Sequence, residues 1–347
     1  MIGGQRAGFE MLYLNGSHMF TKTVHRLLTF AAATLVGTAC IPERAEAQSP
    51  ADRYPSKPIR IVVPFAPGGS ADIITRIVAQ RMTESFGQPV VVENKPGASS
   101  IIGTGFVAKA APDGYTLLVV VSNHITNPSM QAKLPYDTLK DFQAVSLLAR
   151  TPVVVYAHPS FAASNLKEML ALSKSKPGTV SFGSAGIGSV THLTGEMLKL
   201  REGYDMQHIV YRGGAPALAD VLAGHIPLTI ATVGQALPQY QAKQLRALGI
   251  SSEKRYPSVP EIPTFREQGI DIVSTEWYAM LAPSGTPPAI IAKLNTEVRR
   301  ILALPGLGER MNAIELISST PEELEAFLRS EMKQWAPVIQ KLGLKGE

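Results

Sequence analysis

Short apolar runs alternate with helical patterns along most of the chain. Residues 59–65 are rich in β-branched side chains with one charged interruption, which is typical of a parallel strand buried on both faces. A turn containing Gly68 and Gly69 follows, and residues 73–82 then carry apolar side chains at helical spacing. The same order of strand, glycine turn and helix recurs, and such alternation predicts parallel sheets joined by right-handed crossovers.

The remaining elements follow from the same periodicities. Further strands are expected at residues 90–93, 115–121, 153–157, 180–182, 208–211, 228–231, 245–249 and 270–275, and helices at 166–174, 191–200, 287–302 and 321–341. With 347 residues, the chain is long enough for two α/β domains, each with its own core.

An export signal is expected at the N-terminus. Lys22, His25 and Arg26 precede an uncharged run at residues 27–40, and a small-x-small triplet ends at Ala47. The run of 14 residues is shorter than the roughly 20 residues that a membrane-spanning helix needs. We therefore expect a soluble periplasmic protein, with the signal peptide cleaved near Ala47.

A lipoprotein is the alternative form of export. Cys40 would then carry the lipid, but Gly37 stands where such signals usually have Leu or Val, and we favour soluble export. Cleavage after Ala47 removes four basic and three acidic residues, which changes the formal charge from +5 to +4 and leaves no cysteine.

Composition excludes several classes of protein. A hydrophobic content of 45% excludes disorder, and a single Cys excludes a disulfide scaffold. The chain has no dense Lys/Arg cluster, so we expect no nucleic acid partner, although mild basicity would draw in small anions. It has no Gly-Lys-Ser/Thr loop and no histidine pair at metal-ligand spacing, and we expect no cofactor and no metal. We expect a monomer.

Two glycine turns carry the candidate binding chemistry, because each lies between a strand and the start of a helix. A helix N-terminus presents unpaired N–H groups and partial positive charge, which suits a carboxylate. For the first turn a structural alternative is open, in which Ser70 caps the helix and Asp72 complements its dipole. Two such turns, in two series of elements, indicate an anion site closed from both sides. The candidate residues are Phe65, Ala66, Gly68, Gly69, Ser70 and Asp72 in the first turn, and Ala185, Gly186, Gly188, Ser189, Thr191 and His192 in the second.

Asn123 and His124 are further candidates, because they follow the strand at 115–121, where loops of an α/β sheet meet ligands. A satisfied histidine at the end of a loop is an equally good interpretation of His124. Trp277 and Tyr278 could line a cleft, but a place in the core is the better interpretation.

An α/β hydrolase is the enzymatic alternative. Residues 68–72 resemble a nucleophile elbow with Ser70 as the nucleophile, but Asp72 stands where that motif has glycine. The sequence pairs no histidine with Ser70, and we favour a cap or a ligand donor. We therefore expect no enzyme.

A series of short motifs spans nearly all of the chain after the signal peptide. In order, they are Tyr54-Pro55-Ser56-Lys57-Pro58-Ile59-Arg60, Val63-Pro64-Phe65, Pro67-Gly68-Gly69 with Asp72, Asn94-Lys95-Pro96-Gly97-Ala98, Pro112-Asp113-Gly114-Tyr115-Thr116-Leu117-Leu118, Leu134-Pro135-Tyr136-Asp137, Asp141-Phe142, Arg255 with Pro260-Glu261-Ile262-Pro263-Thr264, and Ala282-Pro283-Ser284-Gly285-Thr286-Pro287. The ordered set resembles the extracytoplasmic solute receptors of tripartite tricarboxylate transporters, called Bug receptors. Two segments depart from the family pattern, at residues 122–124 and 209–213.

The resemblance implies a type II-like periplasmic binding protein with two α/β lobes, each a mainly parallel sheet flanked by helices, and a ligand cleft between the lobes. We expect lobe one at residues 48–149 plus 275–347 and lobe two at 150–274. Such a receptor closes on a small organic acid and delivers it to the membrane subunits of the transporter. In this family the two glycine loops hold the ligand carboxylate, which agrees with the candidate residues given above.

The identity of the acid stays open. Amino acids, dicarboxylates, tricarboxylates and aromatic acids all present a similar carboxylate, and Asp72 would favour an ammonium-bearing ligand only if it faced the cleft. A ligand-sensing module with a signalling partner would use the same binding chemistry.

Overall fold

The computed structural model describes residues 53–311 and 313–345. The expected signal peptide and its cleavage point near Ala47 lie outside the described residues. The expected lobe limits, near residues 150 and 274, stay predictions.

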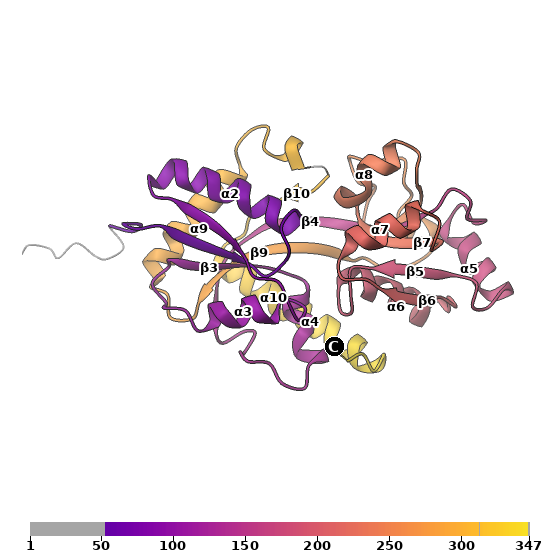
Figure 1. Cartoon of the computed structure of the whole chain (residues 1–347), viewed down its shortest axis with the longest axis horizontal. Coiled ribbons are helices and arrows are strands. Elements are labelled where there is room, and N and C mark those ends of the chain that lie inside the picture. The colour runs from indigo at the N-terminus through magenta and orange to yellow at the C-terminus, as the bar shows by residue number, and fades with distance from the viewer. Residues whose placement is uncertain (1–52, 312, 346–347) are drawn as a thin grey trace, which may run out of the picture. The chain divides into compact units, whose positions relative to one another are not determined.

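Two sheets share one long strand. The first sheet contains, in spatial order, β2 (Val90–Asn94), β1 (Ile59–Val63), β3 (Thr116–Val121), β9 (Thr275–Pro283) and β4 (Phe142–Ala157), with β10 (Glu315–Leu316) also paired to β4. The second contains the end of β4, β7 (Leu228–Thr232), β5 (Ser181–Ser184) and β6 (Gln207–Val210), with β8 (Arg246–Ile250) also paired to β4. In Figure 1, β4 and β9 run from the indigo part of the ribbon towards the magenta and orange part.

Strand direction decides where the two sets of loops lie. In the first sheet, β1, β2 and β3 are parallel, β3 is antiparallel to β9, and β9 is antiparallel to β4. The carboxyl ends of β1, β2 and β3 therefore point along β4 towards the second sheet. In the second sheet, β7 is antiparallel to β4, and β5 and β6 are parallel to β7. Their carboxyl ends point back towards the first sheet, so the loops that follow the two sets of parallel strands face each other.

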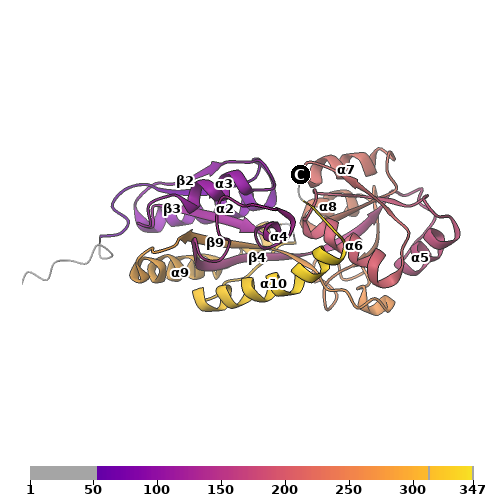
Figure 2. The same ribbon diagram turned by 90° about the horizontal axis from the view of Figure 1, so that it is seen from below.

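Helices cover both faces of each sheet. On the first sheet they are α2 (Ser70–Phe86) and α9 (Pro288–Leu302) on one face, and α3 (Ile101–Ala108), α4 (Asn123–Met130) and α10 (Pro321–Lys341) on the other. On the second sheet they are α5 (Leu166–Ser175) and α6 (Val190–Glu202) on one face, and α7 (Gly214–Leu222) and α8 (Val233–Gln241) on the other. Short 3₁₀ turns occur at η1 (Arg266–Gln268) and η2 (Gly308–Met311). Figure 2 shows α10 lying along β4.

The buried core follows from this layering. Alternate residues of β9 enter different clusters: Trp277 packs under α10, whereas Tyr278 packs under α2 and α9. Both side chains are buried, which agrees with the core interpretation. One cluster continues from the first sheet through Val153 and Val155 to the helices under the second sheet, so the two sheets are joined by packed side chains as well as by β4.

Two strand expectations are corrected. Residues 270–274 form no strand; β9 begins at Thr275 and continues to Pro283. The strand expected at 153–157 is only the end of β4, which begins at Phe142. The reason is that β4 and β9 pair with each other in the antiparallel sense across most of the first sheet, and two bulges in that ladder break the regular alternation of side chains. The fold is a mixed α/β sheet with flanking helices.

Close packing of α6 on β5 generates a stability prediction. A Cβ at Gly195 of α6 would overlap the ring of Phe182, which is fully buried in β5. Gly195→Ala should therefore lower the free energy of unfolding by about 1–3 kcal/mol through overpacking, although Ala normally stabilises a helix relative to Gly. Urea denaturation measures the effect. Gly308→Ala is the matched control, since a Cβ there meets no atom within 4 Å; equal effects of the two changes would contradict this packing.

Candidate functional site

The first glycine turn ends in a helix N-terminus whose donors are free. Gly69 is the N-cap of α2 and supplies no side-chain cap, and the first helical hydrogen bond runs from the Ile73 N–H to the Gly69 carbonyl at 3.0 Å. Within residues 53–311 and 313–345, the N–H groups of Ser70, Ala71 and Asp72 have no acceptor. Ala66 to Gly69 are exposed in the preceding turn, and Phe65 is half-buried against the core. This helix start is therefore an open set of backbone donors.

Asp72 holds this turn in shape. Its buried carboxylate accepts hydrogen bonds from Gly68 N (2.9 Å), Arg76 Nε (2.9 Å) and Asn94 Nδ2 (2.9 Å). Burial alone would raise the pKa of Asp72, but the hydrogen bonds from Arg76, Gly68 and Asn94 outweigh it, and the pKa is lowered. Asp72 thus lies in the first turn of α2, as the structural alternative expected, and its carboxylate is held in the turn. The cap expected at Ser70 is wrong, because Ser70 is the first helical residue and the N-cap position before it is Gly69, which has no side chain.

The second glycine turn uses its side chains on itself. Thr191 Oγ1 accepts from Ala185 N (3.0 Å), His192 Nδ1 accepts from Gly188 N (3.1 Å), and Ser189 Oγ accepts from His192 N (3.2 Å). The Ser189 hydroxyl also donates to the carbonyl of Gly186 at 2.7 Å. The hydroxyls of the candidate residues Ser189 and Thr191 are thus already engaged within the turn. The first helical hydrogen bond of α6 starts at Leu193, and the N–H groups of Val190 and Thr191 have no acceptor among the described residues.

The two sides meet through α4. Thr126 Oγ1 donates to the Gly188 carbonyl at 3.1 Å, so a helix that follows β3 contacts the turn that follows β5. Gly188 has a φ of +76°, and a Cβ there would overlap Met130 of α4. Both the positive φ and the contact with Met130 therefore require glycine at position 188. The structure therefore brings the second turn against the loop region at the end of β3.

Asn123 and His124 lie on the first turn of α4, and their side chains make hydrogen bonds to carbonyl groups of the protein itself. Asn123 Nδ2 and Asn127 Nδ2 both donate to the Ser99 carbonyl, each at 2.9 Å. The His124 ring is fully buried, its Nε2 lies 3.2 Å from the Thr138 carbonyl, and burial lowers its pKa to about 4. His124 therefore has one ring nitrogen bonded within the fold, while its buried Nδ1 has no partner among the described residues.

Two residues of the site were missed in the sequence. The Ser122 N–H, at the end of β3, donates to Glu276 Oε1 at 3.0 Å. Burial raises the pKa of Glu276 to about 7, against the hydrogen bonds from Ser122 and the Trp277 N–H. The sequence did offer a signal for Glu276, because this acidic residue directly precedes the apolar run at 277–283.

No described histidine is placed to activate Ser70. His124 is bonded to Thr138, His192 to Gly188, and His208 Nε2 lies 2.7 Å from Ser184 Oγ. The side chain of Ser70 instead lies close to the Tyr278 hydroxyl. The geometry of a Ser-His pair, which the hydrolase alternative requires, is not found among the described residues.

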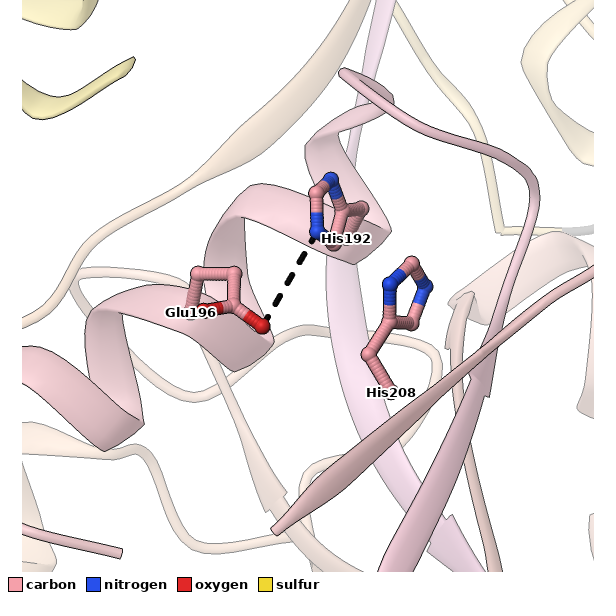
Figure 3. A group of neighbouring side chains, drawn as sticks. All are labelled: His192, Glu196 and His208. Atoms are coloured by element: carbon pink, nitrogen blue, oxygen red, sulfur yellow. Dashed lines mark ion pairs between the residues drawn. The ribbon is translucent and has the colours of Figure 1, made fainter. Parts of the chain in front are cut away.

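One cluster on α6 and β6 has a donor set that a metal could use. His192, Glu196 and His208 place one ligand atom each within 4.8 Å of one another, and Figure 3 shows His208 reaching from its strand towards the two α6 residues. The histidine rings are stacked at 4.1 Å with an angle of 16°, so their lone pairs do not converge on one point. The Glu196 carboxylate also holds Lys199 Nζ at 2.9 Å. The Lys199 ammonium group is thus already the cation beside the Glu196 carboxylate, and we assign no metal to this cluster.

Comparison with known proteins identifies the family. Residues 74–344 match the model of the tripartite tricarboxylate transporter family receptor. The chain belongs to this receptor family. Protein BugT of Bordetella pertussis is 37% identical over 300 residues, which cover 85% of this chain and 92% of BugT. None of the described helices has the length and apolar character to cross a bilayer.

Solved structures of similar proteins share the fold. Rpa4515 of R. palustris with adipate is 28% identical with a TM-score of 0.79, over 84% of this chain and 99% of that one. MatC of Rhodopseudomonas palustris with bound malate is 31% identical with a TM-score of 0.76, over 82% and 100% of the two chains. The mixed α/β fold is therefore that of periplasmic binding proteins, as expected.

The anchoring of Asp72 generates a prediction about pH. Because its folded pKa is lower than its unfolded one, the carboxylate stabilises the fold at neutral pH, and this contribution is lost as the pH falls from about 4 through the folded pKa. Asp72→Asn should lower the free energy of unfolding by about 1.5–3 kcal/mol at pH 7, with a smaller difference near pH 3. Urea denaturation across this pH range measures both.

The control is Asp271→Asn, whose carboxylate also accepts from an arginine, Arg266 Nε at 2.9 Å, but is 86% exposed. It should change stability little at any pH. A pH-independent loss for Asp72→Asn would contradict the assignment.

Proposed function

We propose that this receptor captures a small organic acid in the periplasm and delivers it to the membrane subunits of a tripartite tricarboxylate-type transporter. The observation that carries the proposal is the pair of helix starts, α2 and α6, whose unbonded N–H groups lie at the facing ends of the two sheets. The adipate and malate bound to similar proteins support a carboxylate as the ligand.

The proposed binding uses backbone rather than side-chain donors. The N–H groups of Ser70 and Ala71 would hold one end of the carboxylate ligand, and those of Val190 and Thr191 would approach it from the second sheet. Phe65 would cover the apolar part of the acid. Such hydrogen bonds strengthen as water leaves, because the local dielectric falls. A micromolar affinity, about −8 kcal/mol, allows both capture and release.

Capture requires the two sets of loops to approach and separate. We assign lobe one to residues 48–149 plus 275–347 and lobe two to 150–274, with the hinge in the strands that cross near Arg150 and Ser274. We further propose export with cleavage near Ala47 and function as a monomer without catalysis. The unpaired donors and the family support binding, while Ser70 lacks a neighbouring base among the described residues.

Removal of one backbone donor tests the binding mode. Ser70 is the first residue of α2, a position where proline is tolerated because its missing N–H has no helical acceptor. The preceding Gly69 is extended (φ −78°, ψ 167°), which suits a residue before proline. The chain itself uses proline at this position in α9 and α10. Ser70→Pro should weaken binding of an organic acid such as malate or adipate about tenfold in isothermal titration calorimetry.

Ser70→Ala is the matched control, since it keeps the N–H and removes only the hydroxyl. It should retain most of the affinity. If Ser70→Pro is folded and binds as tightly as the wild type, or if Ser70→Ala loses as much as Ser70→Pro, the backbone cradle at α2 is refuted.

A further inference from the structure

Glu276 lies beside the open helix start of α2. It alternates with Tyr278 along β9, so both side chains are on the sheet face that α2 covers. Tyr278 pairs with Val121, the last residue of β3, which places Glu276 just beyond the end of β3. The Tyr278 hydroxyl lies close to the side chain of Ser70, the first residue of α2. Glu276 is therefore at the sheet edge that presents the α2 donors.

The Glu276 carboxylate is partly exposed, and only neutral groups donate to it. Oε1 accepts from the Ser122 N–H at 3.0 Å, and the Trp277 N–H and the Ser122 side chain also act on this carboxylate. Asp72 differs, because its carboxylate is buried and one of its three donors is the cationic Arg76. Glu276 thus offers the candidate site a partly exposed carboxylate whose donors carry no charge.

No cation of the protein compensates this charge. No described Lys, Arg or His lies within ion-pair distance of Glu276, and the charged group that acts on it is another acid, Glu331 of α10. Glu331 Oε2 accepts from Trp277 Nε1 (3.1 Å) and Trp335 Nε1 (3.3 Å), on the opposite face of β9. A partly buried carboxylate without a counter-ion is costly, and a cationic group of a ligand would offset that cost.

We propose that Glu276 forms a subsite for the protonated amine of an amino carboxylate, whose carboxylate group binds the N–H groups at the start of α2. This inference rests on the proposed function and adds the substrate class. The second carboxylate of a diacid would be repelled at the same position, so Glu276 discriminates between these two classes of acid.

Matched pairs of ligands test the subsite. The probes are alanine with propionate, aspartate with succinate, and glutamate with glutarate, each pair differing only in the amine. Isothermal titration calorimetry of the protein without its signal peptide should show at least one amino carboxylate binding tenfold or more tightly than its partner. This preference should grow between pH 6 and 8, because Glu276 becomes ionised near pH 7 while the ligand amine stays protonated.

Two variants separate the effect of the Glu276 charge from an effect on the local structure. Glu276→Gln keeps an oxygen that can accept from Ser122 N–H, and it should reduce the preference about tenfold and remove its dependence on pH. Glu331→Gln removes the neighbouring acid on the other face of β9 and should leave the preference at pH 8 as it is, because Glu276 is ionised there with or without the Glu331 charge. Tyr278, the other titratable group on the Glu276 face, has a raised pKa and stays neutral throughout this range.

The outcomes distinguish this inference from the proposed function. If none of the three amino carboxylates binds tenfold more tightly than its partner, or if Glu276→Gln keeps the preference, the subsite is wrong while the receptor function stands. If no acid of either kind binds the folded protein, the proposed function fails and this inference fails with it.

Discussion

The antiparallel pairing of β4 with β9 is the constraint on which the rest of the structure depends. Among the described strands, β4 is the one that belongs to both sheets, and its direction relative to β9 and β7 sets the direction of every parallel strand on either side. Because β1 and β3 end towards the second sheet and β5 ends towards the first, their loops must face each other. The strand directions alone therefore place these loop ends opposite each other, where a ligand site can form.

In these loops the side chains and the backbone have different roles. Side chains such as Asp72, Thr191 and His192 hold the turns by binding the N–H groups of Gly68, Ala185 and Gly188. The donors that remain are those at the helix starts themselves. In the proposed binding mode, backbone donors recognise the carboxylate that all organic acids share, so discrimination among acids would come from side chains at the edge of the site. Glu276, a partly exposed carboxylate whose protein donors are all neutral, is the side chain that we propose for this role.

The sequence was sufficient for the parts of the fold that depend on local pattern. The buried strand β3, the amphipathic helix α10 and both glycine turns follow from periodicity and turn chemistry. The length of β4 and the start of β9 did not, because bulges and long-range antiparallel pairing leave a weak local pattern. Among candidate residues, the position of the turns was predictable, but the partners of Asp72 and His124 were not. Those partners, Asn94 and Thr138, are brought close only by the folded sheet.

The central claim is that one ligand is held by backbone donors from both sheets at once. The most direct measurement is an NMR titration of the ¹⁵N-labelled protein with an organic acid that binds it. The account predicts that the amide signals of Ser70, Ala71, Val190 and Thr191 shift together, with one dissociation constant and among the largest changes in the spectrum. Shifts confined to one of the two helix starts, or centred elsewhere in the fold, would contradict it.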